Sequence, residues 1–497
     1  MKEKLNNSDE VEKHGIEKYR LSKYIKIIPI ISIIVTFAII ITSLILLKNN
    51  EGKKPKPKEE DDKKEDESKE DIQNKCIIGE NDKCLTCDND KCGSCNYRYD
   101  LVNGECIPNF SMKATYETNY DNENVTLINY LYINNIVEME IEGKIVQPCD
   151  TYTFNSSGIH IVYFSLNISS LKKLIPLFSS YNHFNHLTSI YFTSKFNTQN
   201  ITSIEGLFYD CQNLTSVDIS NLNMEKMENM NVLFSHCYSL ESIKLPKSLN
   251  PNLKTINSMF NSCTNLTYID LSYFDAKNVK EMSSLFEDCH NLKIINFSNF
   301  DTSNLVKMNS IFENCHSLES LDLTSFNTEK VTIMKNLFKG CLNLTYIDLS
   351  NFKTPNLENI ESMFRDCNSL KFINISIFNT SKITNVNRLF KNCYSLSSID
   401  LLNFNVEEVK NFGEMFSNCY SLTSLDLSNF IIKKGGKMTR MFDECINLIY
   451  LDISNFLQIS GDNFLGNIPS EGKIIISSLV YDYIKQYIPE KWEVIKK

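Results

Sequence analysis

Glycine and tryptophan are scarce in this chain, which has 15 glycines and one tryptophan, Trp492, among its 497 residues. No glycine loop of the kind that cradles phosphates occurs, and neither Gly-x-Ser-x-Gly nor His-Glu-x-x-His is present. Catalysis needs a non-repeating group of side chains in a pocket, and the sequence offers none. We therefore expect a protein that is not an enzyme and that holds no cofactor and no metal.

Positive charge is also in short supply. The formal net charge is −10, and the repeats described below contain no basic tract. A nucleic-acid partner needs a basic patch or stripe, so this class of ligand is not expected. The chain is too long for one compact domain, and its composition changes sharply several times.

The sequence does have a constant period. Cysteine recurs at one fixed interval, at Cys211, Cys237, Cys263, Cys289, Cys315, Cys341, Cys367, Cys393, Cys419 and Cys445. A fixed period over ten units predicts a solenoid of stacked coils rather than a globular core. The cysteine lies on an apolar stripe, so we expect a buried packing residue; the alternative is a ladder of disulfides between coils.

Two apolar patterns alternate within each coil. In Leu-x-x-Ile-x-Phe at 292–297 the last two apolar residues are two apart, which predicts a short strand with one buried face. The apolar residues from Val279 to Cys289 are spaced three and four apart, which predicts a short helix. Strand, turn, helix and turn fit one period, so the sequence predicts an α/β leucine-rich-repeat solenoid over residues 169–456.

The units "MFxxCxSLxxIDLSNFxT" resemble the 26-residue repeats of the BspA-like leucine-rich repeat family of surface proteins. The resemblance covers about half of the chain and recurs ten times in frame. It implies a surface-exposed adhesin that binds host or neighbouring cells.

The composition of the N-terminal part indicates a membrane anchor. Residues 1–26 are polar and should form a cytosolic tail, while 27–47 is an uncharged run that is long enough for one transmembrane helix. A cleaved signal peptide is the alternative, but no small-residue cleavage site follows at 48–50. Basic residues flank the span equally, so charge does not set its orientation. Residues 48–75 should be a charged, disordered stalk, or else a helix with alternating charges.

A cysteine-rich module follows at residues 76–106. Its cysteines are Cys76, Cys84, Cys87, Cys92, Cys95 and Cys106. The module has few large apolar side chains and resembles the furin-like cysteine-rich modules of extracellular receptors, so we expect three disulfides. All fifteen pairings stay open, and a four-thiolate zinc site is the alternative. Disulfides need an oxidising compartment, which predicts a single-pass type II plasma-membrane protein with its repeats outside the cell.

Eleven Asn-x-Ser/Thr sequons support an extracellular glycoprotein, although an Asn-rich chain gains some by chance. They begin at Asn109, Asn124, Asn155, Asn167, Asn200, Asn213, Asn265, Asn296, Asn343, Asn374 and Asn379.

The two ends of the repeats should be capped. Residues 107–168 predict a small antiparallel β domain with strands at 125–133, 136–142 and 159–166. A short helix at 169–178 should then lead into an atypical first coil that has no cysteine. In the C-terminal cap, at 457–497, we expect a strand at 473–477, a helix at 478–487 and a buried Trp492 that seals the last coil.

Residues that alternate with the buried strand positions should point outward on a concave face. The first outward column is Ser216, Ser242, Tyr268, Ile294, Ser320, Tyr346, Phe372, Ser398, Ser424 and Tyr450. The second is Asp218, Lys244, Asp270, Asn296, Asp322, Asp348, Asn374, Asp400, Asp426 and Asp452. Irregular aromatic residues on a regular frame favour recognition, whereas the carboxylates are equally explained by hydrogen bonds within the coil.

We therefore expect a ligand site on this face. Its predicted residues are Tyr268, Tyr346, Phe372, Tyr450, Asp270, Asp322, Asp348, Asp400 and Asp426. The predicted function is that of an adhesin-like or receptor-like protein that recognises a protein or a glycan. The alternative is an architectural coat or secretory-pathway protein without a dedicated ligand. Neither the ligand nor the oligomeric state follows from the sequence.

Overall fold

The computed structural model divides the chain into Met1–Lys75 and Cys76–Lys497, and the residues that it describes lie in the second unit. It describes the backbone at 84–88, 91–95, 99–102 and 105–108, and residues 110–174, 176–178, 186–247, 251–401, 403–433 and 436–497. The predicted tail, span and stalk lie outside these residues. Within them, no helix has the length and apolar character needed to cross a bilayer.

The cysteine-rich module contains two antiparallel strand pairs. β1 (Cys84–Asp88) pairs with β2 (Lys91–Cys95), and β3 (Tyr99–Val102) pairs with β4 (Glu105–Pro108). The backbone register sets Cys87 opposite Cys92. The side chains of these cysteines are outside the described part of the chain, so the three disulfides stay a prediction.

One sheet joins the N-terminal strands to the first repeats. Its order is β13-β12-β11-β5-β10-β7-β8, and β5 runs antiparallel to both β10 and β11. The strands are β5 (Met112–Thr118), β7 (Ile136–Ile141), β8 (Lys144–Val146), β10 (Gly158–Leu166), β11 (Leu187–Phe192), β12 (Ser216–Asp218) and β13 (Ser242–Lys244). β6 (Glu123–Thr126) pairs separately with β9 (Thr151–Phe154). Hydrogen-bonded antiparallel strands therefore cover the edge of the first coil.

Two of the three predicted N-terminal strands are confirmed, as β7 and β10. The predicted strand at 125–133 is wrong, because β6 ends at Thr126 and a 3₁₀ helix, η1, spans Tyr130–Asn135. The side chain of Asn129 accepts a hydrogen bond from the N–H of Leu131 and so caps this helix.

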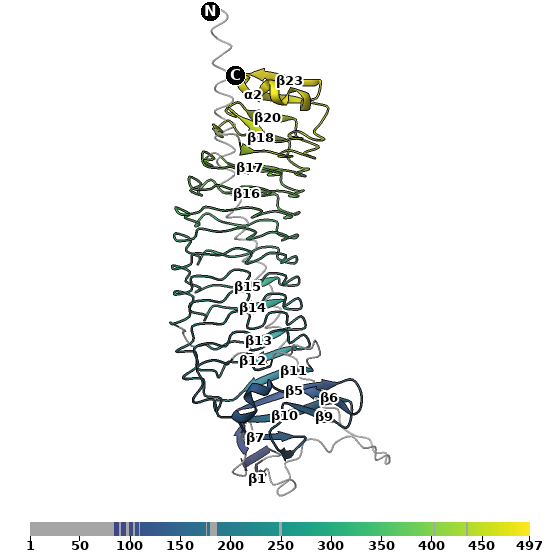
Figure 1. Cartoon of the computed structure of the whole chain (residues 1–497), viewed down its shortest axis with the longest axis vertical. Coiled ribbons are helices and arrows are strands. Elements are labelled where there is room, and N and C mark those ends of the chain that lie inside the picture. Colours follow the sequence, from purple (N-terminus) through teal and green to yellow (C-terminus); the bar gives the residue numbers. More distant parts are fainter. Residues whose placement is uncertain are drawn as a thin grey trace, which may run out of the picture. The chain divides into compact units, whose positions relative to one another are not determined.

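Most coils contribute one short parallel strand, as predicted, but the described coils of Ser320 and Tyr346 contain no strand. β14 (Tyr268–Asp270) pairs with β15 (Ile294–Asn296), so that Ile269 lies beside Ile295. The later strands are β16 (Phe372–Asn374), β17 (Ser398–Asp400), β18 (Ser424–Asp426) and β20 (Tyr450–Ile453). Figure 1 shows these coils stacked on one another. The ladder of strands is broken between β13 and β14, between β15 and β16, and between β17 and β18.

The predicted helix in each coil is wrong. The apolar residues are buried as expected, but the chain forms consecutive turns, with positive φ at Ser284 (58°) and Asp288 (62°). A left-handed residue ends a helix, so two of them four residues apart leave no room for one. The N–H of Phe286 donates instead to the carbonyl of Ile311 in the next coil, at 2.9 Å.

These turns build a second ladder, which we call the turn ladder. Single parallel bridges connect Ser203, Asn229, Thr255, Glu281, Lys307, Ile333, Asn359, Asn385, Asn411 and Lys437 in succession. Lys173 bridges to Ser203, so the predicted helix at 169–178 is also wrong and this segment is the first rung. The turn ladder is continuous where the strand ladder is not.

Phenylalanine rings form the centre of the stack. Phe260 and Phe286 are fully buried, and their ring centroids lie 5.4 Å apart with a 5° interplanar angle. Equivalent rings stack from Phe208 to Phe442. Offset stacking adds to the gain from apolar burial.

The predicted C-terminal cap is confirmed. β22 (Glu471–Ile476) continues the sheet from β20, and β23 (Lys491–Lys496) follows it in parallel. Between them lie α2 (Ser478–Ile484) and the 3₁₀ helix η2 (Lys485–Tyr487). Trp492 is buried, and its indole Nε1–H donates to the carbonyl of Pro469 at 2.8 Å. On the turn side, β19 (Gly436–Lys437) pairs with β21 (Ile459–Ser460) and closes that ladder.

Candidate binding surface on the strand face

The strand face, as we call it, consists of the two outward columns defined above. Pleating turns Ile269 and Ile295 into the core, which leaves their neighbours in sequence on the outside. The exposed fractions are 50% for Tyr268, 60% for Ile294, 55% for Tyr346 and 40% for Phe372. The structure thus places large apolar side chains in water on this face.

Tyr346 and Phe372 lie at equivalent positions of adjacent coils, near the middle of the stack. Partial burial, with a contribution from the carboxylate of Asp348, raises the pKa of Tyr346. Its hydroxyl therefore stays protonated at neutral pH and can donate a hydrogen bond. Tyr450, the last aromatic residue of the column, is only half-buried, and burial likewise raises its pKa.

The acidic column is tied to its own coils. The Asp322 Oδ1 accepts hydrogen bonds from the Thr324 N–H (2.9 Å) and hydroxyl (2.7 Å), and these bonds lower the pKa of Asp322. The same bond to the N–H two residues later is made by Asp218, Asp270, Asn296, Asp348, Asn374, Asp426 and Asp452. Hydrogen bonding within the coil, the structural alternative, is therefore confirmed for these residues. A role in binding stays a prediction.

Cross-coil contacts offset part of the repulsion between these carboxylates. Lys244 Nζ lies 3.1 Å from Asp218 Oδ2, and the Asn296 amide donates to Asp270 Oδ1 at 3.0 Å. Single cations and amides in this column thus separate carboxylates that would otherwise be adjacent.

The ten repeat cysteines are buried thiols outside any disulfide, as is expected of packing residues, and Cys149 is half-buried and also outside any disulfide. Sequence reasoning missed their hydrogen bond. The Cys289 Sγ–H donates at 3.0 Å to the carbonyl of Phe260, and equivalent bonds run along the stack. Burial raises the pKa of Cys445 to about 12 and holds the pKa of Cys289 well above its usual range.

A family model described as "Mycoplasma protein of unknown function, DUF285" matches residues 151–245, 254–373 and 358–460. Together these segments make up more than half of the chain. The chain belongs to the DUF285 family. The finer resemblance to BspA-like repeats stays a prediction.

Solved structures that resemble this DUF285 chain are repeat proteins with low identity. A leucine-rich repeat protein from Bacteroides ovatus is 20% identical, over 67% of this chain and 94% of that one, with a TM-score of 0.34. The pneumococcal vaccine antigen PcpA is 15% identical over 60% and 77%, with a TM-score of 0.30. The functional domain of InlJ from Listeria monocytogenes, whose description includes a cysteine ladder, is 14% identical over 65% and 77%, with a TM-score of 0.17. A comparison with curated proteins finds no match.

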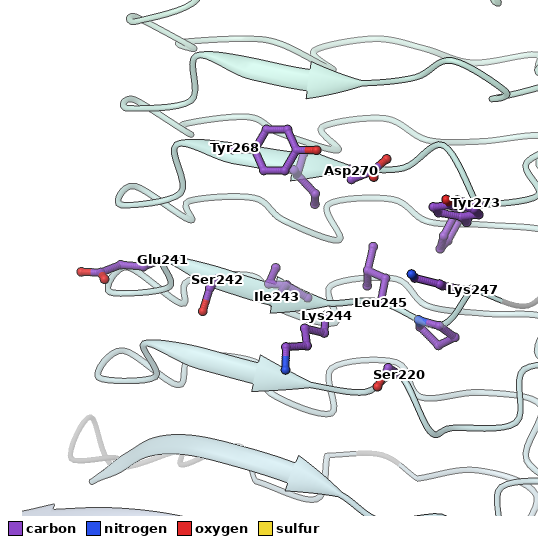
Figure 2. Close-up of a pocket in the computed structure, with 13 residues that line it drawn as sticks. Ser220, Glu241, Ser242, Ile243, Lys244, Leu245, Lys247, Tyr268, Asp270 and Tyr273 are labelled. Atoms are coloured by element: carbon purple, nitrogen blue, oxygen red, sulfur yellow. The ribbon is translucent and has the colours of Figure 1, made fainter. Parts of the chain in front are cut away.

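A hollow of about 520 Å³ opens on the strand face of the DUF285 repeats where the sheet breaks between β13 and β14. Figure 2 shows Tyr268, Asp270 and Tyr273 on the β14 side of it, and Ser242 and Lys247 on the β13 side. Two of the predicted site residues, Tyr268 and Asp270, therefore line a cavity. Sequence reasoning missed Lys247 and Tyr273, although the departure of this coil from the repeat would have indicated them.

Proposed function

We propose that this DUF285 chain is a membrane-anchored surface protein whose repeats recognise a protein partner through the strand face, as an adhesin or receptor does. One observation carries the proposal. The coil frame hardly changes, whereas the outward column exposes Tyr268, Tyr346 and Phe372 among serines. Folding alone requires no such aromatic side chains in water, and recognition benefits from them.

The centre of the face is the expected energetic focus. Binding free energy concentrates in aromatic anchors that lose all contact with water, and surrounding residues mainly exclude solvent. Tyr346 and Phe372 meet this description because their rings are about half exposed and neighbour each other in the repeat. A protein ligand suits them better than a glycan, because Phe372 and Ile294 offer no hydrogen bond to a sugar hydroxyl.

The proposal includes a membrane anchor in the N-terminal part and an extracellular location for the repeats. The uncharged run at 27–47 supports a membrane span, and the clustered cysteines at 76–106 support an oxidising exterior. An architectural role is the second candidate. The observation that favours it is the acidic column, whose regularity is accounted for by hydrogen bonds inside each coil.

The test is a paired substitution in the full-length chain. The partner would be identified by photo-crosslinking from a benzoylphenylalanine placed at Ser320, one coil before Tyr346. We expect Tyr346→Ser with Phe372→Ser to weaken its binding at least tenfold, about 1.4 kcal/mol. Ser already stands at this position in several coils, so the fold should survive.

The matched control is Tyr209→Ser with Tyr238→Ser, which removes two exposed tyrosines that lie outside the strand face. Its affinity for the partner should equal that of the wild type. Unchanged affinity in the Tyr346/Phe372 variant would move the site away from the strand face. Failure to crosslink any protein at this face would favour the architectural role.

A further inference from the structure

One coil departs from the repeat where the hollow lies. Lys244 and Pro246 stand where the neighbouring coils have Asp and Ser. Asp270 Oδ1 accepts a hydrogen bond from the Ser272 N–H at 2.9 Å, whereas a lysine side chain cannot accept a hydrogen bond and proline has no N–H to donate. The turn that ends the neighbouring strands in this way cannot form after β13.

A buried phenylalanine that the later coils share is also absent from this coil. The eight coils that follow place a phenylalanine, from Phe274 to Phe456, at the position that the sequence fills here with Ser248. The phenylalanine of the next coil is slightly less buried than the one after it: Phe274 is 9% exposed, whereas Phe300 is fully buried. Ile243 and Leu245 are half-buried although the residues equivalent to them in adjacent coils are buried. The hollow therefore exposes apolar side chains that other coils cover.

The rim of the hollow carries two tyrosines and a lysine beside these apolar side chains. Tyr268 and Tyr273 are 50% and 53% exposed, and both line the hollow. Lys247 Nζ lies 5.5 Å from the centroid of the Tyr273 ring. Within the described residues this ammonium forms no salt bridge, whereas that of Lys244 is paired with Asp218. The Lys247 ammonium can therefore form a charge-assisted hydrogen bond with a carboxylate of a ligand that binds in the hollow.

We propose that the hollow is a docking site for an aromatic side chain of a protein partner, with a carboxylate next to it in sequence that pairs with Lys247. The volume of about 520 Å³ lies in the range of ligand pockets. A phenyl ring would pack on Ile243, Leu245 and Phe274, the apolar side chains that line the hollow. A sugar would bury some of its hydroxyls against the side chains of Ile243, Leu245 and Phe274, which can form no hydrogen bond with them. This inference rests on the proposed function and names the chemistry of its ligand.

The probe is the blocked peptide acetyl-Gly-Phe-Glu-Gly-amide, titrated into the full-length chain and followed by ligand-observed NMR. Its affinity should exceed that of the Ala-for-Phe and the Gln-for-Glu peptides at least tenfold. Ser242→Trp places a large side chain in the mouth of the hollow, and Lys247→Glu reverses the charge. Each should weaken binding of the Phe-Glu peptide at least tenfold.

Repeat symmetry supplies the controls. Ser398→Trp makes the same change at the equivalent position of another coil, and Lys371→Glu removes an exposed lysine elsewhere. Both should bind the peptide like the wild type, and a thermal melt confirms that all four variants fold. Equal binding to the Ser242→Trp variant, no discrimination among the peptides, or saturation by glucose or galactose alone would overturn the inference. The partner affinity of the Tyr346/Phe372 variant tests the proposed function separately, because neither residue lines this hollow.

Discussion

Each repeat cysteine both fills space and makes a hydrogen bond. Cys289 is fully buried, and its thiol donates to the carbonyl of Phe260 in the preceding coil. A small side chain with a donor suits this position, because an apolar residue leaves the bond unmade and a larger one does not fit. The constancy of cysteine through ten coils follows from both demands.

Substitutions of Cys289 separate these two demands. Cys289→Ala should destabilise the repeats by about 1–2 kcal/mol, because it removes a buried side chain and its hydrogen bond. Cys289→Ser should cost no more than this, because its hydroxyl can donate to the carbonyl of Phe260. Urea unfolding followed by circular dichroism measures both. A serine variant clearly less stable than the alanine variant would show that a hydroxyl at this position does not make the bond to the Phe260 carbonyl that offsets the cost of its burial.

The buried thiols also predict how stability depends on pH. Burial raises the pKa of Cys289, Cys341 and Cys393 in the folded chain above that of the unfolded chain. The folded state thus favours the neutral thiol, so its stability is complete below about pH 8.5, the pKa of an unfolded cysteine. It should decline as the pH rises above this value. Melting temperatures between pH 7 and pH 10 test this, and a variant with alanine at these three positions should show a smaller decline.

At the scale of elements, the turn ladder is what the sequence did not reveal. The spacing of three and four between Met282, Leu285, Phe286 and Cys289 fits a helix and fits these turns equally well, because both bury one side of the chain. The distinguishing signal lies in the polar residues between them. The left-handed positions carry mostly Ser, Asn, Asp or Gly, residues that favour caps and turns. The strand frame was predictable because a spacing of two has no helical counterpart.

Val232 provides a test of this element. It occupies a left-handed position with φ 48°, where the equivalent residues include Gly206, Ser258 and Asn336. A β-branched side chain is strained there, at a cost of about 1–3 kcal/mol. Val232→Asn should therefore raise the free energy of unfolding by about 1 kcal/mol. Val306→Asn changes a valine that is also half-buried but does not have a positive φ, and it should bring no gain.

At the scale of the whole molecule, the period predicted the solenoid and its coils, and the departures from the period at both ends predicted the caps. It did not predict that β5 would join the N-terminal strands and the repeats in one sheet, because strand pairing between distant segments leaves no periodic signal. The hollow was missed for another reason. The hollow lies where Lys244 and Pro246 replace the Asp and Ser of the neighbouring coils. A comparison that looks for residues shared by all coils does not detect a coil in which they are replaced. The exposed aromatic residues of the first outward column, by contrast, were predictable from the repeat pattern alone.

Recognition of a partner on another cell, as we propose it, requires these repeats to lie outside the cell. Protease added to intact cells measures this directly, with detection by one antibody against the predicted cytosolic tail and another against the repeats. We expect the repeats to be removed while a small N-terminal fragment stays protected, and we expect detergent to abolish this protection. Repeats that resist protease until the membrane is opened would contradict the proposal.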